Sequence, residues 1–335
     1  MENIKNARNT NAIKNRTKPV VEPQITIIIP HFDSSNYIEK LLASIPKAPE
    51  IQTIVIDDKS SGSHVDMVRS LQSQYAFEFY HNDRTKSAGT CRNIGLEHAS
   101  GRWVLFADSD DYFLDGFYEN VSRYFESQAD VIYFMPTSIY SDTGEIADRH
   151  IDFQEISKAY MNNRDKNNDI KLRYSLHIPT CKLMRRSFIE KHHVRFDEVL
   201  ASNDVMFSVK SGHYMKTFEI DDSEIYCLTR NRGSLTTNLS EEILDARLET
   251  QVRFFDFLKK HLSKDEIAVL EPKSLRLLIR AFRDHGLTKF IKTLHLYQRN
   301  HIKWFYLSYL RPSRLVSRVI GNLIGYRRMQ RFTVK

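Results

Sequence analysis

Short β-branched runs alternate with helix-length amphipathic segments between residues 25 and 135, and this alternation limits the possible folds more than any other feature of the chain. The first run, residues 25–30, is almost entirely apolar and ends in proline, which is typical of a strand buried on both faces of a sheet. Similar runs occur at 53–56 and 103–107. Strands that alternate with helices favour right-handed βαβ units. We therefore expect an α/β domain with a mainly parallel sheet and helices on both faces.

Residue periodicity predicts the other elements. Helices are expected at residues 36–45, 65–74, 88–98 and 115–127, and strands at 77–80 and 131–134. Beyond Met135 the alternation weakens, and the polar residues between 162 and 169 predict a loop. Order resumes at 178–198, and helices are expected almost throughout 241–335.

Acidic residues follow two of the predicted strands at the point where each strand ends. Asp57 and Asp58 follow one strand, and Asp108 and Asp110 follow the other. Because the carboxyl ends of parallel strands meet at one edge of a sheet, these side chains should converge where ligands bind. Neighbouring carboxylates repel one another, and a hard cation such as Mg²⁺ or Mn²⁺ relieves that repulsion. Asp108 and Asp110 are the predicted metal ligands.

Helix capping is the alternative explanation for this acidic cluster. Asp111 or Asp115 has the side chain and the position to cap the helix predicted at 115–127. On that interpretation, the acidic residues after the strand form only a turn and a helix start.

Seven segments, in this order along the chain, resemble the family-two glycosyltransferases of the GT-A fold, which take a sugar from a nucleotide-sugar donor. They are residues 27–30, 55–60, 91–96, 106–111, 182–183 with 194–198, 203–207 and 230–236. The resemblance runs from about residue 25 to 237, nearly two-thirds of the chain. It implies a GT-A (Rossmann-like) domain with a C-terminal helical appendage.

The resemblance also implies which residues bind the donor. Asp58, together with Asp57, would hold the uracil or ribose of a uridine nucleotide, since carboxylates accept hydrogen bonds from base N–H groups and sugar hydroxyls. Pro30 and Phe32 would line the base pocket. Asp108 would lie near the ribose and the metal.

Three arginines match the family's basic positions. Arg92 lies on a helix with small residues on one face, and its guanidinium would reach the nucleotide. The alternative is a structural ion pair between Arg92 and Asp57 or Asp58. Arg230 and Arg232 would offset the charge that develops on the departing diphosphate.

Asp204 is the general base that the resemblance implies. It would accept the proton of the acceptor hydroxyl as that oxygen attacks the anomeric carbon in one inverting displacement. The segment 202–207 is also a plausible helix start, so Asp204 has helix capping as an alternative or additional role.

Four residues depart from the family pattern. His31 is unusual after the proline, Asp33 stands where asparagine is common, and Asn203 replaces the usual glutamate before Asp204. Cys91 stands where alanine is common, and we expect it to be a small core residue rather than a reactive thiol.

Charge is distributed unevenly along the chain. The net charge of +7 divides into −4 for residues 1–240 and +11 for 241–335, and no acidic residue follows Asp284. Residues 314–328 place apolar residues on one helical face with arginines around it, which favours a helix lying on an anionic membrane. Packing of this face on the catalytic domain or on a second subunit is the alternative. We do not expect nucleic-acid binding, because no known binding module is present.

Other functional classes lack their motifs. The three cysteines form no CxxC pair, which argues against a disulfide framework or a zinc site and favours a reducing cytosol. The sequence contains no GxxxxGK[ST], GxGxxG or GxSxG motif. With no signal peptide and no apolar run long enough to span a bilayer, we expect a cytoplasmic protein, peripheral at the cytoplasmic face of the cell membrane.

Together these features predict four regions and one activity. The regions are a mobile arm (1–24), a nucleotide-sugar-binding half (25–135), an acceptor-side half (136–240) and a basic helical region (241–335). The predicted activity is Mn²⁺- or Mg²⁺-dependent transfer of a sugar from a UDP-sugar to a glycan or lipid-linked glycan in cell-surface polysaccharide synthesis. A nucleotidyltransferase and a non-catalytic membrane- or polyanion-binding scaffold are the alternatives.

Overall fold

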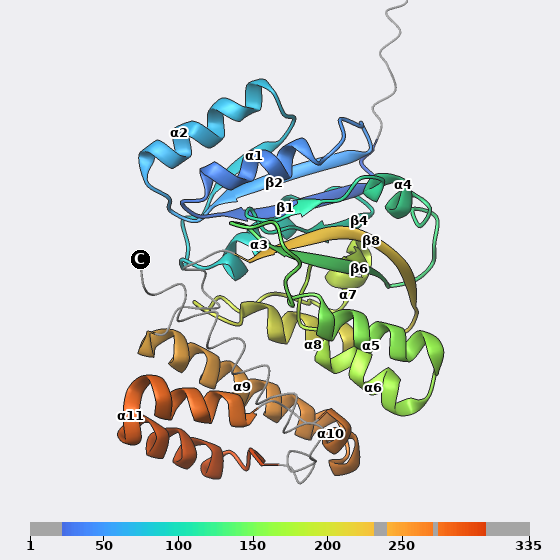
Figure 1. The fold of residues 1–335 in the computed structure, drawn as a ribbon. Coiled ribbons are helices and arrows are strands. Elements are labelled where there is room, and N and C mark those ends of the chain that lie inside the picture. Colours follow the sequence, from blue (N-terminus) through green and yellow to red (C-terminus); the bar gives the residue numbers. More distant parts are fainter. Residues whose placement is uncertain (1–21, 231–239, 271–273, 306–335) are drawn as a thin grey trace, which may run out of the picture.

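The computed structural model describes residues 22–230, 240–270 and 274–305, and a curled eight-stranded sheet forms its centre (Figure 1). The strands are β1 (Ile25–His31), β2 (Ile51–Asp57), β3 (Glu78–His81), β4 (Trp103–Phe106), β5 (Tyr112–Phe113), β6 (Val131–Tyr140), β7 (Lys182–Arg185) and β8 (Phe218–Arg230). The helices between them are α1 (Ser35–Ala43), α2 (Gly62–Ser70), α3 (Ala88–His98), α4 (Phe117–Ser122), α5 (Ile151–Asn162), α6 (Lys166–Ser175), α7 (Arg186–Lys191) and α8 (Asn203–Tyr214). The C-terminal helices are α9 (Glu241–His261), α10 (Lys264–Leu270) and α11 (Ser274–Arg299).

The sheet confirms the α/β prediction and its mainly parallel character. Its strand order is β3-β2-β1-β4-β7-β6-β8-β5, and β5 and β7 run against the other strands. Figure 1 shows α1 and α2 on one side of the sheet and α3 and α8 on the other. Every residue of β1 is buried, and the strand lies between the two layers of helices, which explains why that run is almost wholly apolar.

Strand register brings the predicted site residues to one edge. His31 at the end of β1 pairs in register with Asp57 at the end of β2, and Asp57 pairs with His81 at the end of β3. The β4 strand also lies beside β1, with Phe106 opposite Ile28. The segments that follow these parallel strands therefore start from the same edge of the sheet.

The loop predicted for 162–169 is wrong, because two helices meet there. The α5 helix ends at Asn162, and Asp165 caps α6 by accepting a hydrogen bond from the backbone N–H of Asn168 at 2.8 Å. Among the Asn and Asp residues of this segment, Asp165 is the cap of α6, and Asn162 and Asn167 occupy exposed positions in helices. The helix predicted at 115–127 is also shorter, since α4 covers only Phe117–Ser122.

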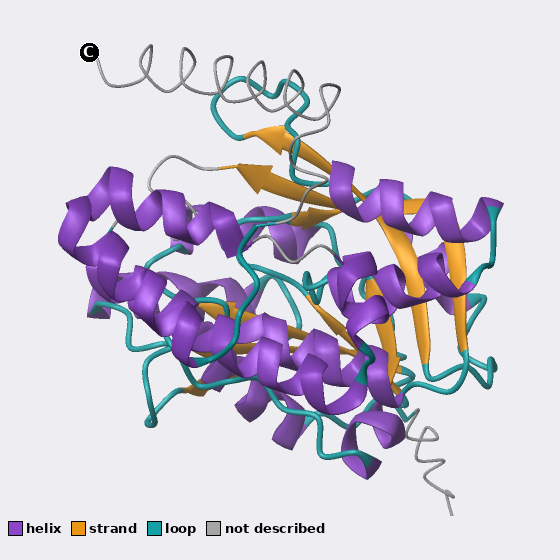
Figure 2. Cartoon of the chain, turned by 90° about the horizontal axis from the view of Figure 1, so that it is seen from below, coloured by secondary structure: helices purple, strands orange, loops and turns teal. Residues whose placement is uncertain are grey.

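The C-terminal helices form a second apolar core against α6 and α8. This core includes Leu244, Leu248, Phe255, Leu258, Leu278 and Tyr297 from α9 and α11, with Ile170, Met206 and Val209 from α6 and α8. The view from below shows this helical layer in front of the sheet (Figure 2). A kink at Gly286, where φ is +79°, divides α11 into two helical arms. Among the described helices, none is long and apolar enough to cross a membrane.

Candidate active site

Asp57 is buried at the end of β2 and is held by a histidine. Nδ1 of His31 lies 3.2 Å from Oδ1 of Asp57, and the backbone N–H of Ser60 donates to Oδ2. Burial raises the pKa of Asp57, but the hydrogen bonds from His31 and Ser60 outweigh it and lower that pKa to about 2. His31, the unusual residue after Pro30, thus keeps Asp57 ionised.

Asp58 is also buried, and it fixes the loop that follows β3. Its Oδ1 accepts a hydrogen bond of 2.7 Å from Nδ2 of Asn82, which also donates to the carbonyl of Thr85. The Lys59 ammonium donates to the carbonyl of Arg84 in the same loop. The loops after β2 and β3 therefore form one connected surface at the predicted nucleotide pocket.

Phe32 lies at this surface with 45% of its side chain exposed, whereas Pro30 is buried within β1. The ammonium of Lys86 lies over the Phe32 ring, 3.4 Å from its centroid. The neighbouring Asp33 has φ of +44° and accepts a hydrogen bond from the backbone N–H of Ser61. Asp and Asn tolerate this backbone conformation better than other side chains, so Asp33 can stand where the family commonly has Asn.

Arg92 joins the parts of the site that are predicted to bind the donor and the acceptor. Its Nη2 donates to Oδ1 of Asp108 at 2.6 Å, and its Nη1 donates to Oδ1 of Asn203 at 2.9 Å. Arg92 is buried, and its guanidinium pairs with Asp108 rather than with Asp57 or Asp58. Asn203 stands where the family usually has glutamate, so Arg92 has a neutral partner at this position.

The α3 helix can approach α8 this closely because Gly89 has no side chain. A Cβ atom at Gly89 would lie 2.2 Å from the carbonyl oxygen of Asp197 and 2.8 Å from Cβ of Asn203. One turn along α3, the Asn93 side chain donates to the carbonyl of Phe196 and accepts from its backbone N–H. Helix α3 therefore sets where α8 begins.

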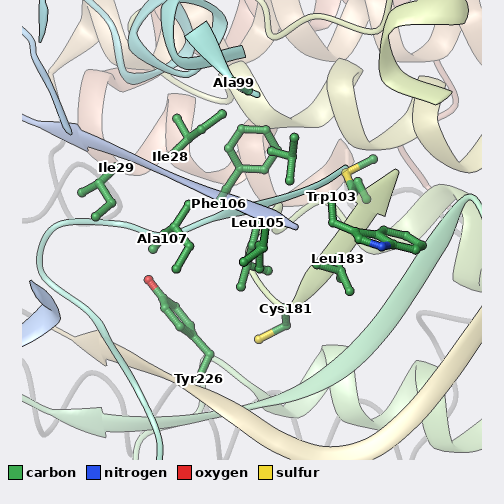
Figure 3. Packing of buried hydrophobic residues seen from close by; sticks show 14 of the residues in the cluster. Ile28, Ile29, Ala99, Trp103, Leu105, Phe106, Ala107, Cys181, Leu183 and Tyr226 are labelled. Carbon is green, nitrogen blue, oxygen red and sulfur yellow. The ribbon is translucent and has the colours of Figure 1, made fainter. Parts of the chain in front are cut away.

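The segment after β4 is held from the far side of the sheet. Tyr226 of β8 accepts a hydrogen bond of 2.8 Å at its hydroxyl from the backbone N–H of Asp108, and Figure 3 shows that hydroxyl pointing towards Ala107. Oδ1 of Asp111 accepts from the backbone N–H of Thr229, also in β8. Burial raises the pKa of Asp111 well above its usual range. Neither Asp111 nor Asp115 caps α4, whose capping residue is Gly116.

Asp108 and Asp110 are only partly buried and supply two carboxylates on one short segment. Mg²⁺ and Mn²⁺ in nucleotide enzymes are commonly bound by one or two carboxylates together with phosphate oxygens of the substrate. The donor atoms present are therefore of the right kind for such a cation. Among the described residues, no group of three or more His, Cys, Asp or Glu side chains is arranged to hold a metal ion.

Asp204 lies in the first turn of α8, next to the Asn203 that bonds Arg92. The capping position belongs to Ser202, so Asp204 is not the cap of this helix. Burial raises the pKa of Asp204, against the opposing effect of the positive charge on Arg92. A carboxylate whose pKa is raised is a stronger base than an exposed one.

Of the two arginines predicted to bind the diphosphate, Arg230 lies within the described residues. Arg230 ends β8, where its Nη1 forms an ion pair of 2.6 Å with Asp148 and its guanidinium lies over the ring of Tyr140. Arg232 lies outside the described residues.

Cys91 is fully buried under the sheet, and burial raises the pKa of its thiol, which confirms the expectation of a core residue. All three cysteines are free and buried, in agreement with the absence of a disulfide framework.

Two polar residues of this site have no role assigned to them by the sequence analysis, although the segment 182–183 belongs to the family resemblance. Asn82 holds Asp58, and Lys182 on β7 is buried close to Asp204. Lys182 is the one charged residue between positions 178 and 184. A charged side chain is unusual on a strand in the middle of a sheet, because such a strand has no exposed face for an ammonium group.

Residues 26–192 match the family model described as glycosyl transferase family 2. The chain belongs to this family. The family and the relatives named below make this chain a glycosyltransferase, and they favour that activity over the nucleotidyltransferase and scaffold alternatives.

Similar proteins agree with this family assignment. The glycosyltransferase is 24% identical over 264 residues to the poly(ribitol-phosphate) beta-N-acetylglucosaminyltransferase TarS of Staphylococcus aureus (strain MW2). That alignment covers 72% of this chain and 44% of TarS, so the chain spans less than half the length of that relative. A shorter match, 33% identical over 98 residues, is to the GalNAc(5)-diNAcBac-PP-undecaprenol beta-1,3-glucosyltransferase of Campylobacter jejuni and covers 28% of this chain and 32% of that protein.

Solved structures show the same fold. The structure of residues 1–349 of S. aureus TarS has a TM-score of 0.59 at 19% identity and covers 88% of this glycosyltransferase and 87% of that chain. TarS has also been solved in complex with UDP-GlcNAc, with a TM-score of 0.52 at 17% identity, covering 84% of this chain and 93% of that one. The mannosyltransferase PcManGT of Pyrobaculum calidifontis, in complex with GDP-Man and Mn²⁺, has a TM-score of 0.54 at 14% identity and covers 91% of this chain and 88% of that one. These likenesses establish the GT-A architecture with its C-terminal helices.

Proposed function

We propose that this glycosyltransferase moves a sugar from a UDP-sugar to a hydroxyl of a glycan or lipid-linked glycan, with inversion, in the synthesis of a cell-surface polymer. The observation that carries the proposal is the connection made by Arg92. This one side chain bonds Asp108 on the donor side and Asn203, the neighbour of Asp204, on the acceptor side. A donor bound beside Asp108 would thus have Asp204, the proposed base, within reach of its anomeric carbon.

In the proposed reaction, Asp204 accepts the proton of the acceptor hydroxyl while that oxygen attacks the anomeric carbon. The bond between the anomeric carbon and the diphosphate oxygen breaks, and UDP leaves on the opposite face of the sugar. Asp57 and Asp58 shape the nucleoside pocket, and the exposed face of Phe32 is available for the base. The raised pKa of Asp204 makes its carboxylate a better proton acceptor than an exposed aspartate.

Asp108 and Asp110 would hold a divalent cation, which would neutralise charge on the diphosphate. In support, the structurally similar mannosyltransferase was solved with Mn²⁺ and GDP-Man. Arg230 and Arg232 remain proposed partners of the diphosphate. Arg230 would first have to release Asp148, which is mostly exposed and therefore holds it weakly.

The relatives support the proposed substrate classes. TarS is named for transfer of N-acetylglucosamine to poly(ribitol-phosphate) and has been solved with UDP-GlcNAc, and the Campylobacter relative is named for a polyprenol-linked acceptor. By analogy, we propose a UDP-sugar donor and an acceptor of the teichoic acid, polysaccharide or lipid-linked type.

We also propose peripheral contact between the basic C-terminal region and an anionic membrane. The stripe predicted at 314–328 lies outside the described residues. Within them, α11 exposes four large apolar side chains, those of Ile279, Phe282, Leu287 and Ile291. Arg276 and Lys292 are exposed on the same helix, and this combination suits the interface of an anionic bilayer.

The activity is tested by measuring UDP release and sugar transfer across a panel of UDP-sugars with Mn²⁺, for the wild type and for Asp204→Asn and Asp110→Ala. We expect each substitution to lower transfer by roughly 10²-fold or more, the usual contribution of general-base catalysis or of a stabilising charge. The exposed carboxylate of Asp66 on α2 offers a matched control, and Asp66→Asn should leave transfer unchanged. Undiminished transfer in both site variants would contradict the proposal.

Membrane contact is tested by sedimentation with vesicles containing anionic lipid. We expect the double variant Phe282→Ser, Leu287→Ser to bind vesicles less than the wild type while retaining UDP release. Equal binding by the two proteins, or equal binding to neutral vesicles, would refute contact through this face.

A further inference from the structure

Lys182 carries a buried positive charge and has no role in the mechanism proposed above. It lies on β7 in the middle of the sheet, with only 3% of its surface exposed. Within the described part of the chain, its ammonium forms no ion pair with a carboxylate. Transferring an ammonium group from water to such a place without a paired charge costs several kcal/mol, so a lysine here calls for a functional reason.

The hydrogen bonds of Lys182 tie β7 to the helix that carries Asp204. Its Nζ donates to the backbone carbonyl of Leu176, in the segment leading into β7, and to Oγ of Ser208 at 3.3 Å. Ser208 in turn donates to the carbonyl of His177 at 2.6 Å. Because Ser208 is four residues after Asp204, both lie on one face of α8. Lys182 therefore holds the first turns of α8 against the sheet.

The charges around Asp204 come from three elements. Arg92 of α3 and Lys182 of β7 are positive and lower its pKa, whereas Asp108 after β4 is negative and raises it. Arg92 is already paired with Asp108 and shares its other hydrogen bond with the neutral Asn203. Around Lys182 itself lie Asp204, the thiol of Cys181 and the ring of Tyr133, 5.8 Å from Nζ. Lys182 is thus a positive charge beside Asp204 that no carboxylate pair neutralises.

We propose that Lys182 is a positioning residue for Asp204, which fixes the start of α8 through Ser208 and favours the ionised form of the Asp204 carboxylate by its buried charge. This inference rests on the proposed function, in which Asp204 is the base. In this role, the Lys182 ammonium does not contact the acceptor.

The test is the pH dependence of kcat/KM, followed as UDP release from UDP-GlcNAc with Mn²⁺, or from whichever UDP-sugar the wild type uses best. In Lys182→Met, we expect the acidic limb of the profile to move up by about one pH unit, since an opposite charge nearby lowers a carboxyl pKa by 1–3 units. Below that limb, kcat/KM should fall about tenfold relative to the wild type. Lys182→Arg keeps the charge and should leave the limb in place.

Two further variants separate this role from a general loss of structure. Ser208→Ala removes the hydrogen bond but not the charge, so kcat should fall without movement of the acidic limb. Lys289→Met is the matched control, because Lys289 is also buried but pairs with Glu241 and Asp245 on the C-terminal helices. It should not move the limb.

An unmoved acidic limb in Lys182→Met, or the same shift in Lys289→Met, would overturn the inference while leaving the proposed function intact. If Lys182→Met does not fold, a limb displaced by Lys182→Arg or by Ser208→Ala would overturn it instead. Failure of the proposed function gives a different result, namely a wild type that releases no UDP or an Asp204→Asn variant as active as the wild type.

Discussion

The two edges of the site that we propose to bind the donor and the acceptor both contain charged side chains, but they hold those charges in different ways. On the donor side, Asp57 is bonded by His31, Asp58 by Asn82 and Asp108 by Arg92. On the acceptor side, within the described residues, Asp204 and Lys182 have no ion-pair partner. Carboxylates held by neighbouring side chains give a preformed binding surface, whereas Asp204, which has no ion pair there, keeps a raised pKa that proton transfer can use.

The largest expected effect comes from breaking the pair that joins the two edges. Arg92→Met should leave Asp108 without its partner and Asn203 without its donor, and we expect the free energy of unfolding to fall by about 3 kcal/mol. Urea denaturation at pH 7 measures it. A loss below about 0.5 kcal/mol, the range of exposed ion pairs, would show that Arg92 does not couple the edges.

On the acceptor side, removal of a buried charge should raise the free energy of unfolding instead of lowering it. Lys182→Met replaces an unpaired buried ammonium with an apolar chain of similar length, and we expect about 2 kcal/mol of added stability at pH 7. Lys289→Met, which removes a paired lysine, should instead reduce stability. A destabilised Lys182→Met variant would mean that the hydrogen bonds of Lys182 outweigh its desolvation.

The same variant predicts a pH dependence. Burial lowers the pKa of Lys182 from 10.5 to about 7, so above pH 7 the unfolded state binds more protons than the folded state. Stability of the wild type should therefore rise from pH 7 to 8.5 by up to about 1.4 kcal/mol per pH unit relative to Lys182→Met. Parallel curves for the two proteins would contradict the lowered pKa.

A smaller effect should follow from removing His31, one of the partners of Asp57. The pKa of Asp57 lies below its unfolded value of 3.8, so this interaction stabilises the protein above about pH 4 and is lost as pH falls towards 2. We expect His31→Leu to cost about 1–2 kcal/mol at pH 6 and less at pH 3. Urea denaturation at both pH values checks this, and an equal cost at both would assign the effect to packing alone.

The smallest effect should come from the exposed contact between Lys86 and Phe32. An exposed cation–π contact contributes about 0.5–1 kcal/mol, so Lys86→Ala should change stability by less than that amount. Titration of UDP by calorimetry should show at most a change of about fivefold in Kd. A larger loss of affinity would give Lys86 a direct contact with the nucleotide.

The same contrast explains how much of the molecule could be predicted from its sequence. Strands β1, β2 and β4 and helix α3 follow from local periodicity, and parallel pairing then places Asp57, Asp58 and Asp108 at one edge. The bond between Arg92 and Asn203 joins residues 111 positions apart, and local patterns do not encode it. Helix α6 was missed because its exposed face and its cap are rich in Asn and Asp, which are also typical of loops.

The position of β7 in the sheet has a consequence for how this enzyme can be divided. Although β7 comes from the second half of the chain, it lies between β4 and β6 and pairs with both. A fragment that stops at Met135 would leave the edge of β4 uncovered and open to pairing with other chains. Recombination between relatives should therefore succeed when a crossover keeps β4, β6 and β7 from one parent. On the proposed function, acceptor preference would be exchanged by replacing α8 and the helices beyond it, not by joining the N-terminal half of one protein to the C-terminal half of another.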